Sequence, residues 1–93
     1  MRTISAPNLG FALGGLVGFL HFAWALLVMA QVAQPVIDFV FWAHFIGPAF
    51  RVEAFNPVTA AVLVVFTSAV GFVVGYALGL GWNWLQRPHA ENL

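Results

Sequence analysis

The chain has 93 residues, of which only 6% are charged and 62% are hydrophobic, and its mean hydropathy is +0.95. Soluble domains carry about a quarter charged residues, and domains of this size bury only about 60% of their surface. This composition therefore argues against a water-soluble fold and predicts a single all-α membrane domain. The zero net charge without a basic patch argues against nucleic-acid binding, and the absence of cysteine excludes disulfides and thiolate chemistry.

The first long apolar segment, residues 9–33, follows a short polar lead, residues 1–8. At about 1.5 Å per helical residue it is long enough to cross a hydrocarbon layer of about 30 Å. A cleaved signal peptide is the alternative, with Val28-Met-Ala30 as its cleavage site, but its apolar core would span only about 7–15 residues. We therefore expect a retained transmembrane helix over 9–33.

A shorter apolar helix is predicted at residues 36–47, with Asp38 in its first turn and Gly47-Pro48 as its stop signal. It is too short to cross a bilayer, and Trp42 is typical of the headgroup boundary. We therefore expect it to lie at the membrane interface, covered by lipid or by a partner protein.

The second long apolar segment is predicted as a transmembrane helix over residues 57–85, followed by a polar tail, residues 86–93. Asn56 caps this helix and Pro57 suits its first position. Trp82 and Trp84 are expected to anchor its other end in the interface.

Two spans make an antiparallel two-helix hairpin with both termini on one side of the membrane. Arg2 and Arg87 lie near the ends of the chain, whereas Arg51 in the connection is offset by Asp38 and Glu53. The positive-inside rule then predicts a prokaryotic inner (cytoplasmic) membrane protein with both termini in the cytoplasm.

Small residues recur at every fourth position in both spans, which places each set on one narrow helix face. Such stripes let two membrane helices approach closely. In an antiparallel pair we expect Gly18 to lie near Gly71, with the other pairs following in register; alternatively, each stripe serves a different subunit. The predicted packing residues are Gly10, Gly14 and Gly18 in the first span and Thr67, Gly71, Gly75 and Gly79 in the second.

His21 continues the first stripe and lies near the middle of its span, where an ionisable side chain is a candidate functional residue. One interpretation is a neutral imidazole bonded to the hydroxyl of Thr67 or Ser68 across the contact. Another is an axial ligand to haem or bacteriochlorophyll, with Trp24 and neighbouring Phe against the ring. Proton transfer is a third, although neither span offers a carboxylate relay.

The sequence offers no arrangement that predicts catalysis. His21, His44 and His89 lie on separate segments without metal-ligand spacing, so we expect no metal site. Asp38 is better explained as a first-turn helix residue than as a catalytic acid, and no nucleophile with a positioned base occurs. We therefore expect a protein that is not an enzyme and has no firm cofactor.

The pattern resembles a group of small two-span bacterial membrane proteins of unknown function, the DUF5676-type family. Matching pieces run through most of residues 9–85, and the resemblance implies a fold but no activity and no site residues. The pieces are Phe11-Ala-Leu-Gly14, Asp38 to Gly47, Pro57-Val-Thr59 and Gly71-Phe-Val-Val-Gly75-Tyr-Ala-Leu-Gly79 through Trp84.

The function these observations favour is a structural or accessory membrane subunit that packs against copies of itself or within a larger membrane complex. The alternative is a tetrapyrrole-binding accessory subunit of a photosynthetic or respiratory complex, using His21. A pore-forming oligomer is a weaker alternative, because neither span has a polar face to line a channel.

Overall fold

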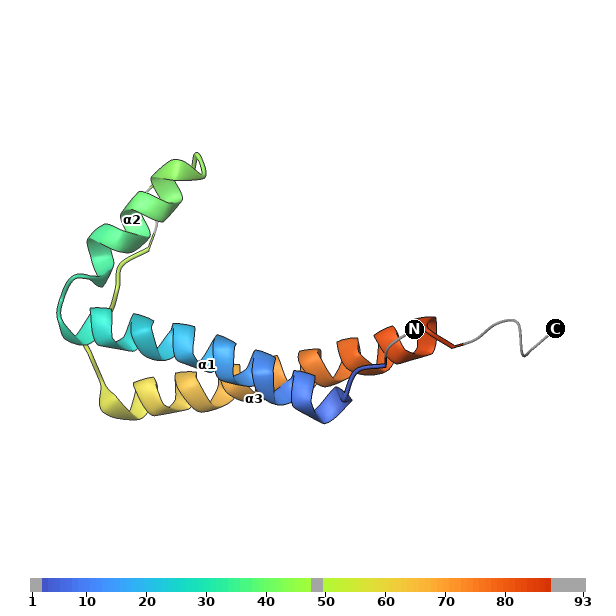
Figure 1. The fold of residues 1–93 in the computed structure, drawn as a ribbon. Helices are drawn as coiled ribbons and strands as arrows, with labels where there is room; N and C mark the ends of the chain where they lie inside the picture. Colours follow the sequence, from blue (N-terminus) through green and yellow to red (C-terminus); the bar gives the residue numbers. More distant parts are fainter. Residues whose placement is uncertain (1–2, 48–49, 88–93) are drawn as a thin grey trace.

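The computed structural model describes residues 3–47 and 50–87 (Figure 1). Three helices follow one another in the chain: α1 (Ala6–Met29), α2 (Ala33–Ala43) and α3 (Pro57–Leu85). No strand occurs in the described residues, which confirms the predicted all-α class. Parts of the predicted lead, turn and tail lie outside the described residues: 1–2, 48–49 and 88–93.

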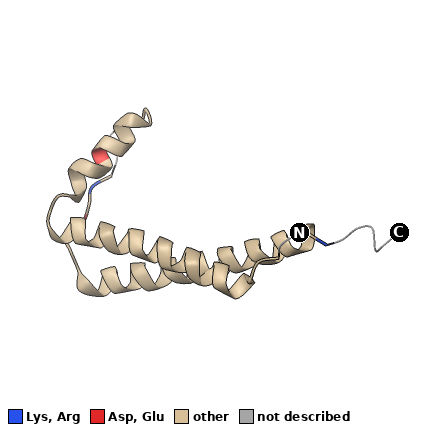
Figure 2. Ribbon diagram, viewed as in Figure 1, with Lys and Arg blue, Asp and Glu red and all other residues tan. Residues whose placement is uncertain are grey.

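The two long helices, α1 and α3, lie side by side and run in opposite directions (Figure 1). The start of α1 lies beside the end of α3, since a Cβ added at Gly79 would be 2.8 Å from the Cα of Ala6. Both helices are uncharged along their whole length, and the charged residues of the described chain lie on α2, in the connection and past the end of α3 (Figure 2). Their length and apolar composition are compatible with crossing a membrane.

The ends of α1 differ from the predicted segment. The helix starts at Ala6 because Ser5 accepts a hydrogen bond from the Asn8 amide (3.3 Å) and Pro7 lies in the first turn, where a missing N–H costs little. It ends at Met29 because Gln31 adopts a positive φ of 64°. The bonds that close this end run from the Gln31 amide to the Val28 carbonyl and from the Val32 amide to the Leu27 carbonyl, the pattern of a Schellman motif.

The short helix α2 occupies residues 33–43 rather than the predicted 36–47. Pro35 lies in its first turn, where the amide N–H of a helix has no partner within the helix, so the helix starts ahead of the proline. Its end is set by Phe45, which has a φ of 63°, before the predicted stop at Gly47 is reached. Figure 1 shows α2 projecting away from the α1–α3 pair.

The connection from α2 to α3 folds back along α2 and is held there by the Gln34 side chain and by a ring contact. The Gln34 amide nitrogen donates to the Phe50 carbonyl (3.1 Å) and to Asp38 Oδ1 (2.9 Å), while its oxygen accepts from the Val52 amide (2.6 Å). The rings of Phe41 and Phe50 also meet, with centroids 5.6 Å apart. The Gln34 amide therefore provides hydrogen-bond partners for backbone groups of the extended connection, as a neighbouring strand would in a sheet.

Both ends of α3 are tied by asparagine side chains. Asn56 Oδ1 accepts from the Val58 and Thr59 amides, at 2.9 and 3.2 Å, and caps the helix at Pro57. At the other end, Asn83 accepts from the Ile4 amide and donates to the Ile4 carbonyl, both at 2.6 Å. This second pair joins the start of the chain to the last turns of α3.

We expect Gln34→Ala to free the connection from α2. Losing hydrogen bonds worth about 0.5–1.5 kcal/mol each should make the Val52 amide exchange with deuterium about tenfold faster, while the Val58 amide is unchanged. Gln86→Ala is the matched control, because no side-chain hydrogen bond of Gln86 is present among the described residues. Equal exchange of Val52 in both variants would show that Gln34 does not hold the segment.

Candidate functional site

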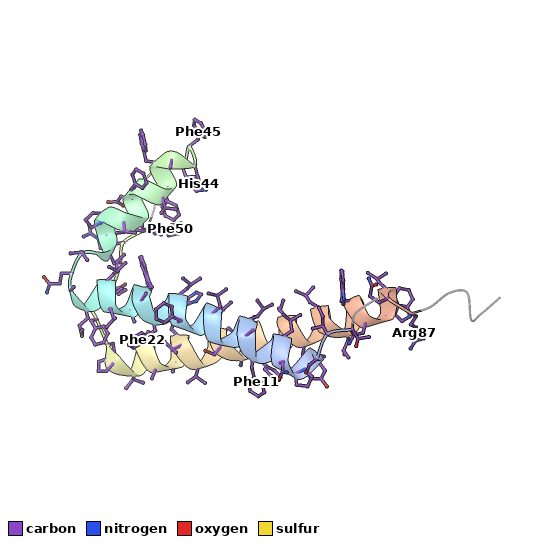
Figure 3. The ribbon with its side chains drawn as sticks, viewed as in Figure 1. Phe11, Phe22, His44, Phe45, Phe50 and Arg87 are labelled. Carbon is purple, nitrogen blue, oxygen red and sulfur yellow. The ribbon has the colours of Figure 1, made fainter. Side chains whose placement is uncertain are left out.

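The buried residues of the described chain are all alanine or glycine, which is the reverse of a soluble core. Most of them form two facing stripes along α1 and α3, and large apolar side chains point outward (Figure 3). The stripes consist of Ala6, Gly10, Gly14 and Gly18 on α1 and Gly71, Gly75 and Gly79 on α3.

The register of these stripes differs by one helical turn from the predicted one. A Cβ added at Gly71 would lie 3.0 Å from the Cα of Gly14, and one added at Gly75 would lie 2.9 Å from the Cα of Gly10. The predicted pairing of Gly18 with Gly71 is therefore wrong. The reason is Ala6, which belongs to the helix and faces Gly79, so that the α1 stripe starts one turn earlier than its first glycine.

The fourth pair of facing small residues is Gly18 on α1 and Ser68 on α3. A Cβ added at Gly18 would overlap Ser68 Oγ and would lie 3.2 Å from Ser68 Cβ. Thr67, predicted to belong to the stripe, is half-buried, and its hydroxyl donates to the Leu63 carbonyl of its own helix (2.7 Å). Ser68 therefore takes the position opposite Gly18.

At each central glycine, a carbonyl oxygen of the other helix occupies the space that a side chain would need. A Cβ built there would lie 2.8 Å from the Leu13 oxygen at Gly71 and 2.6 Å from the Leu9 oxygen at Gly75. The same holds in reverse, because Gly14 faces the Ser68 oxygen at 2.8 Å. Close approach of helix backbones is the setting in which Cα–H···O contacts recur.

Aromatic side chains border the stripe. Phe72 lies over Gly10, where an added Cβ would be 2.9 Å from its ring, and its centroid is 5.0 Å from Phe11 and 5.8 Å from Tyr76. Phe72 was not among the packing residues predicted from the sequence. The position of Phe72 could have indicated this contact. It directly follows Gly71 of the stripe, so its side chain leaves α3 at the edge of the face that packs on α1.

His21 does not reach the hydroxyls of α3 as one interpretation expected. Its Nδ1 lies 2.8 Å from the Val17 carbonyl oxygen of its own helix, which acts as the acceptor when Nδ1 carries the proton. In the observed register Gly18, not His21, lies opposite Ser68. His44 makes the same bond to the Val40 carbonyl (2.6 Å), so this is a local arrangement that two helices share.

The three tryptophans predicted to anchor the chain in the membrane interface lie in two regions, one at the end of α3 and the other on α2. Trp42 is on α2, with 73% of its surface exposed, and Trp82 and Trp84 are in the last turn of α3. Phe45, beyond the end of α2, is fully exposed at the tip of the molecule (Figure 3).

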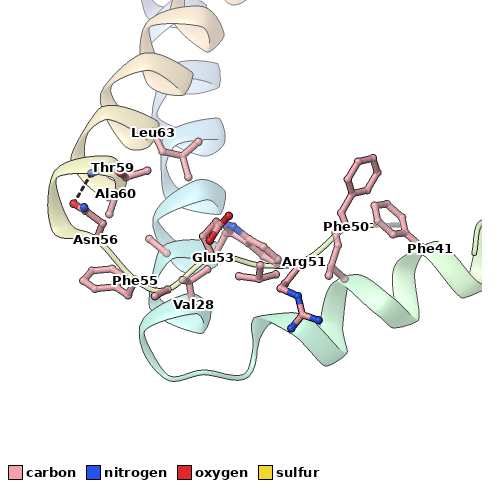
Figure 4. A pocket seen from close by; sticks show the side chains of 15 residues that line it. Val28, Phe41, Phe50, Arg51, Glu53, Phe55, Asn56, Thr59, Ala60 and Leu63 are labelled. Carbon is pink, nitrogen blue, oxygen red and sulfur yellow. Dashed lines mark hydrogen bonds between the residues drawn. The ribbon is translucent and has the colours of Figure 1, made fainter. Parts of the chain in front are cut away.

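A cavity of about 370 Å³ lies where α1, α2 and the start of α3 meet the connection (Figure 4). This cavity was not predicted from the sequence, because its walls come from four different segments of the chain. Its inner wall is apolar, with Trp24, Ala25 and Leu63, while Arg51 and Glu53 line it from the connection. In the described residues these two charges form no ion pair. No group of three or more metal-ligating side chains occurs within the described part of the chain.

No family model, curated protein or solved structure matches the chain. The resemblance to the two-span bacterial family thus stays a prediction.

We expect Gly75→Ala to destabilise the α1–α3 contact by about 1–3 kcal/mol, because the added methyl overlaps backbone atoms that cannot move without separating the helices. Gly81→Ala on the same helix is the control. A Cβ there meets nothing within 4 Å, so stability should be unchanged or higher by up to about 1 kcal/mol. Reversible unfolding in mixed detergent micelles measures both variants, and equal stability would contradict the observed contact.

Proposed function

We propose that the protein is a small integral membrane subunit with a structural or accessory role rather than a catalytic one. It crosses a prokaryotic inner membrane as an antiparallel helical hairpin, with α2 at the interface on the side opposite the termini. The observation that carries this proposal is the inverted burial of α1 and α3, in which small residues face each other and large apolar side chains face outward. Lipid is the solvent that such outer faces require.

The lengths of the helices support a spanning arrangement. With 24 and 29 residues, α1 and α3 are about 36 and 44 Å long at 1.5 Å per residue, which exceeds a hydrocarbon layer of about 30 Å. Their outer ends carry Trp82, Trp84 and Arg87, and the other end carries α2 with Trp42. The chain has no cysteine, so Thr3→Cys and Gly47→Cys can each be labelled with an impermeant maleimide. Added to one side of the membrane, the reagent should label only one of the two variants.

The proposed partner surface is the outside of the helix pair. The small-residue stripe is already used between α1 and α3, so another subunit would pack on the exposed aromatic side chains. These include Phe11, Phe19 and Phe22 on α1, Phe39 and Trp42 on α2, and Phe66 on α3. Aromatic side chains are enriched at protein interfaces, and a self-assembled or mixed complex would cover them.

We expect the full chain to resist alkaline extraction from membranes and to elute from mild detergent as an oligomer or with a co-purifying membrane subunit. The measurement is the protein mass by light scattering, corrected for bound detergent, together with mass spectrometry of the eluate. A monomer without a stoichiometric partner would overturn the accessory role, and extraction by alkali would overturn the membrane location.

One observation favours tetrapyrrole binding as a second candidate function. With Nδ1 bonded to the Val17 carbonyl, the lone pair of His21 Nε2 is free to act as an axial ligand, an arrangement in which the backbone bond fixes the ring. Haem or bacteriochlorophyll held in this way would supply electron transfer or light absorption.

We expect this second function to show as a Soret or near-infrared band in protein purified from its native membrane. His21→Ala should abolish the band, whereas His44→Ala, which removes a histidine with the same local bond, should leave it. No band in the wild-type protein, or a band that both variants retain, would rule out the role of His21.

A further inference from the structure

The cavity beside α2 has an apolar floor and a charged rim. Its floor is formed by Trp24, Ala25 and Leu63 of the two long helices, and its rim by the connection that leads to α3. A volume of about 370 Å³ is within the range of roughly 300–1,000 Å³ that is typical of small-molecule sites. In the proposed orientation the floor lies toward the hydrocarbon and the rim toward the headgroups.

The rim carries one charge of each sign. Arg51 and Glu53 both line the cavity and both are exposed, and in the view of Figure 4 their charged ends lie on different sides of the connection. They form no ion pair with each other or with any other residue in the part of the chain that the structure describes. An unpaired guanidinium is a strong donor to phosphate, and an unpaired carboxylate is an acceptor for an ammonium group.

We propose that this cavity binds one zwitterionic phospholipid of the phosphatidylethanolamine type. The phosphate takes hydrogen bonds from Arg51, the ammonium group donates to Glu53, and part of an acyl chain lies on the apolar floor. The inference rests on the proposed membrane location, which supplies the lipid. It adds a specific ligand site to a protein whose proposed role is otherwise structural.

Charge complementarity is what selects this lipid. A lipid with net negative charge would gain the contact with Arg51 but would place its headgroup beside the carboxylate of Glu53. A diacylglycerol would fill the floor and leave both charges without partners. Only a headgroup with both signs satisfies Arg51 and Glu53 together.

The position of the rim is fixed by contacts already described. Gln34 holds the backbone at Phe50 and Val52, on both sides of Arg51, and Asn56 starts α3 three residues after Glu53. The two charged residues thus belong to a segment with tied ends, which reduces the ordering that lipid binding would require.

The test is lipid retention by the full-length protein in detergent, counted by native mass spectrometry with phosphatidylethanolamine, phosphatidylglycerol and diacylglycerol offered separately. One phosphatidylethanolamine per chain is expected in preference to the other two. Arg51→Gln and Glu53→Gln should each weaken its binding about two- to fivefold, the range for a solvent-exposed ion pair. Arg87→Gln, which removes an equal charge at the far end of α3, should not change it.

Equal or stronger retention of phosphatidylglycerol would overturn the assigned role of Glu53 and with it the proposal. Equal retention of diacylglycerol, or an equal effect of Arg87→Gln, would also overturn it. Alkaline extraction of the same membranes separates the two levels of inference. A chain that stays in the membrane but prefers no lipid contradicts the lipid site alone, whereas a chain that is extracted contradicts the proposed function.

Discussion

The structure depends on backbone contact between α1 and α3. Four pairs of small residues, from Ala6 opposite Gly79 to Gly18 opposite Ser68, bring the helices so close that the glycines leave no room for a Cβ. In a bilayer the surrounding lipid is as apolar as the side chains, so burial of large side chains would give little drive for association. Close van der Waals packing of the two backbones then holds the pair together.

The remaining features follow from where that contact ends. Beyond Gly18 the facing side chains include Trp24 and Leu63, and these line the cavity instead of closing on each other. The chain reverses through two turns with positive φ and returns along α2, held by Gln34. The close packing of one half of the helix pair is thus matched by an open, more polar region at the other, where the charged residues of the connection lie.

The all-α class and the positions of the stripes could be predicted from the sequence. Glycines that recur every four residues in an apolar helix must lie on one face of it. The register was not predictable in the same way, since Ala6 was assigned to the polar lead. Because small residues recur every four positions on both helices, shifting one helix by one turn gives an equally good match of the two stripes. The ends of α1 and α2 were misplaced because Gln31 and Phe45, which set them, adopt a conformation that glycine usually supplies. The cavity and the Gln34 bonds depend on contacts distant in sequence, which no local pattern encodes.

Phe45 shows why the molecule is to be understood together with its surroundings. A non-glycine residue in the left-handed region costs about 1–2 kcal/mol, and its ring, fully exposed, gains nothing from the described chain in return. Glycine is available two residues later but is not used for the turn. The residue that takes the turn therefore places an aromatic ring just beyond the end of α2, the helix that carries Trp42. In the proposed orientation this ring enters the membrane interface or a neighbouring subunit, and burial there offsets the cost that the isolated chain leaves unbalanced.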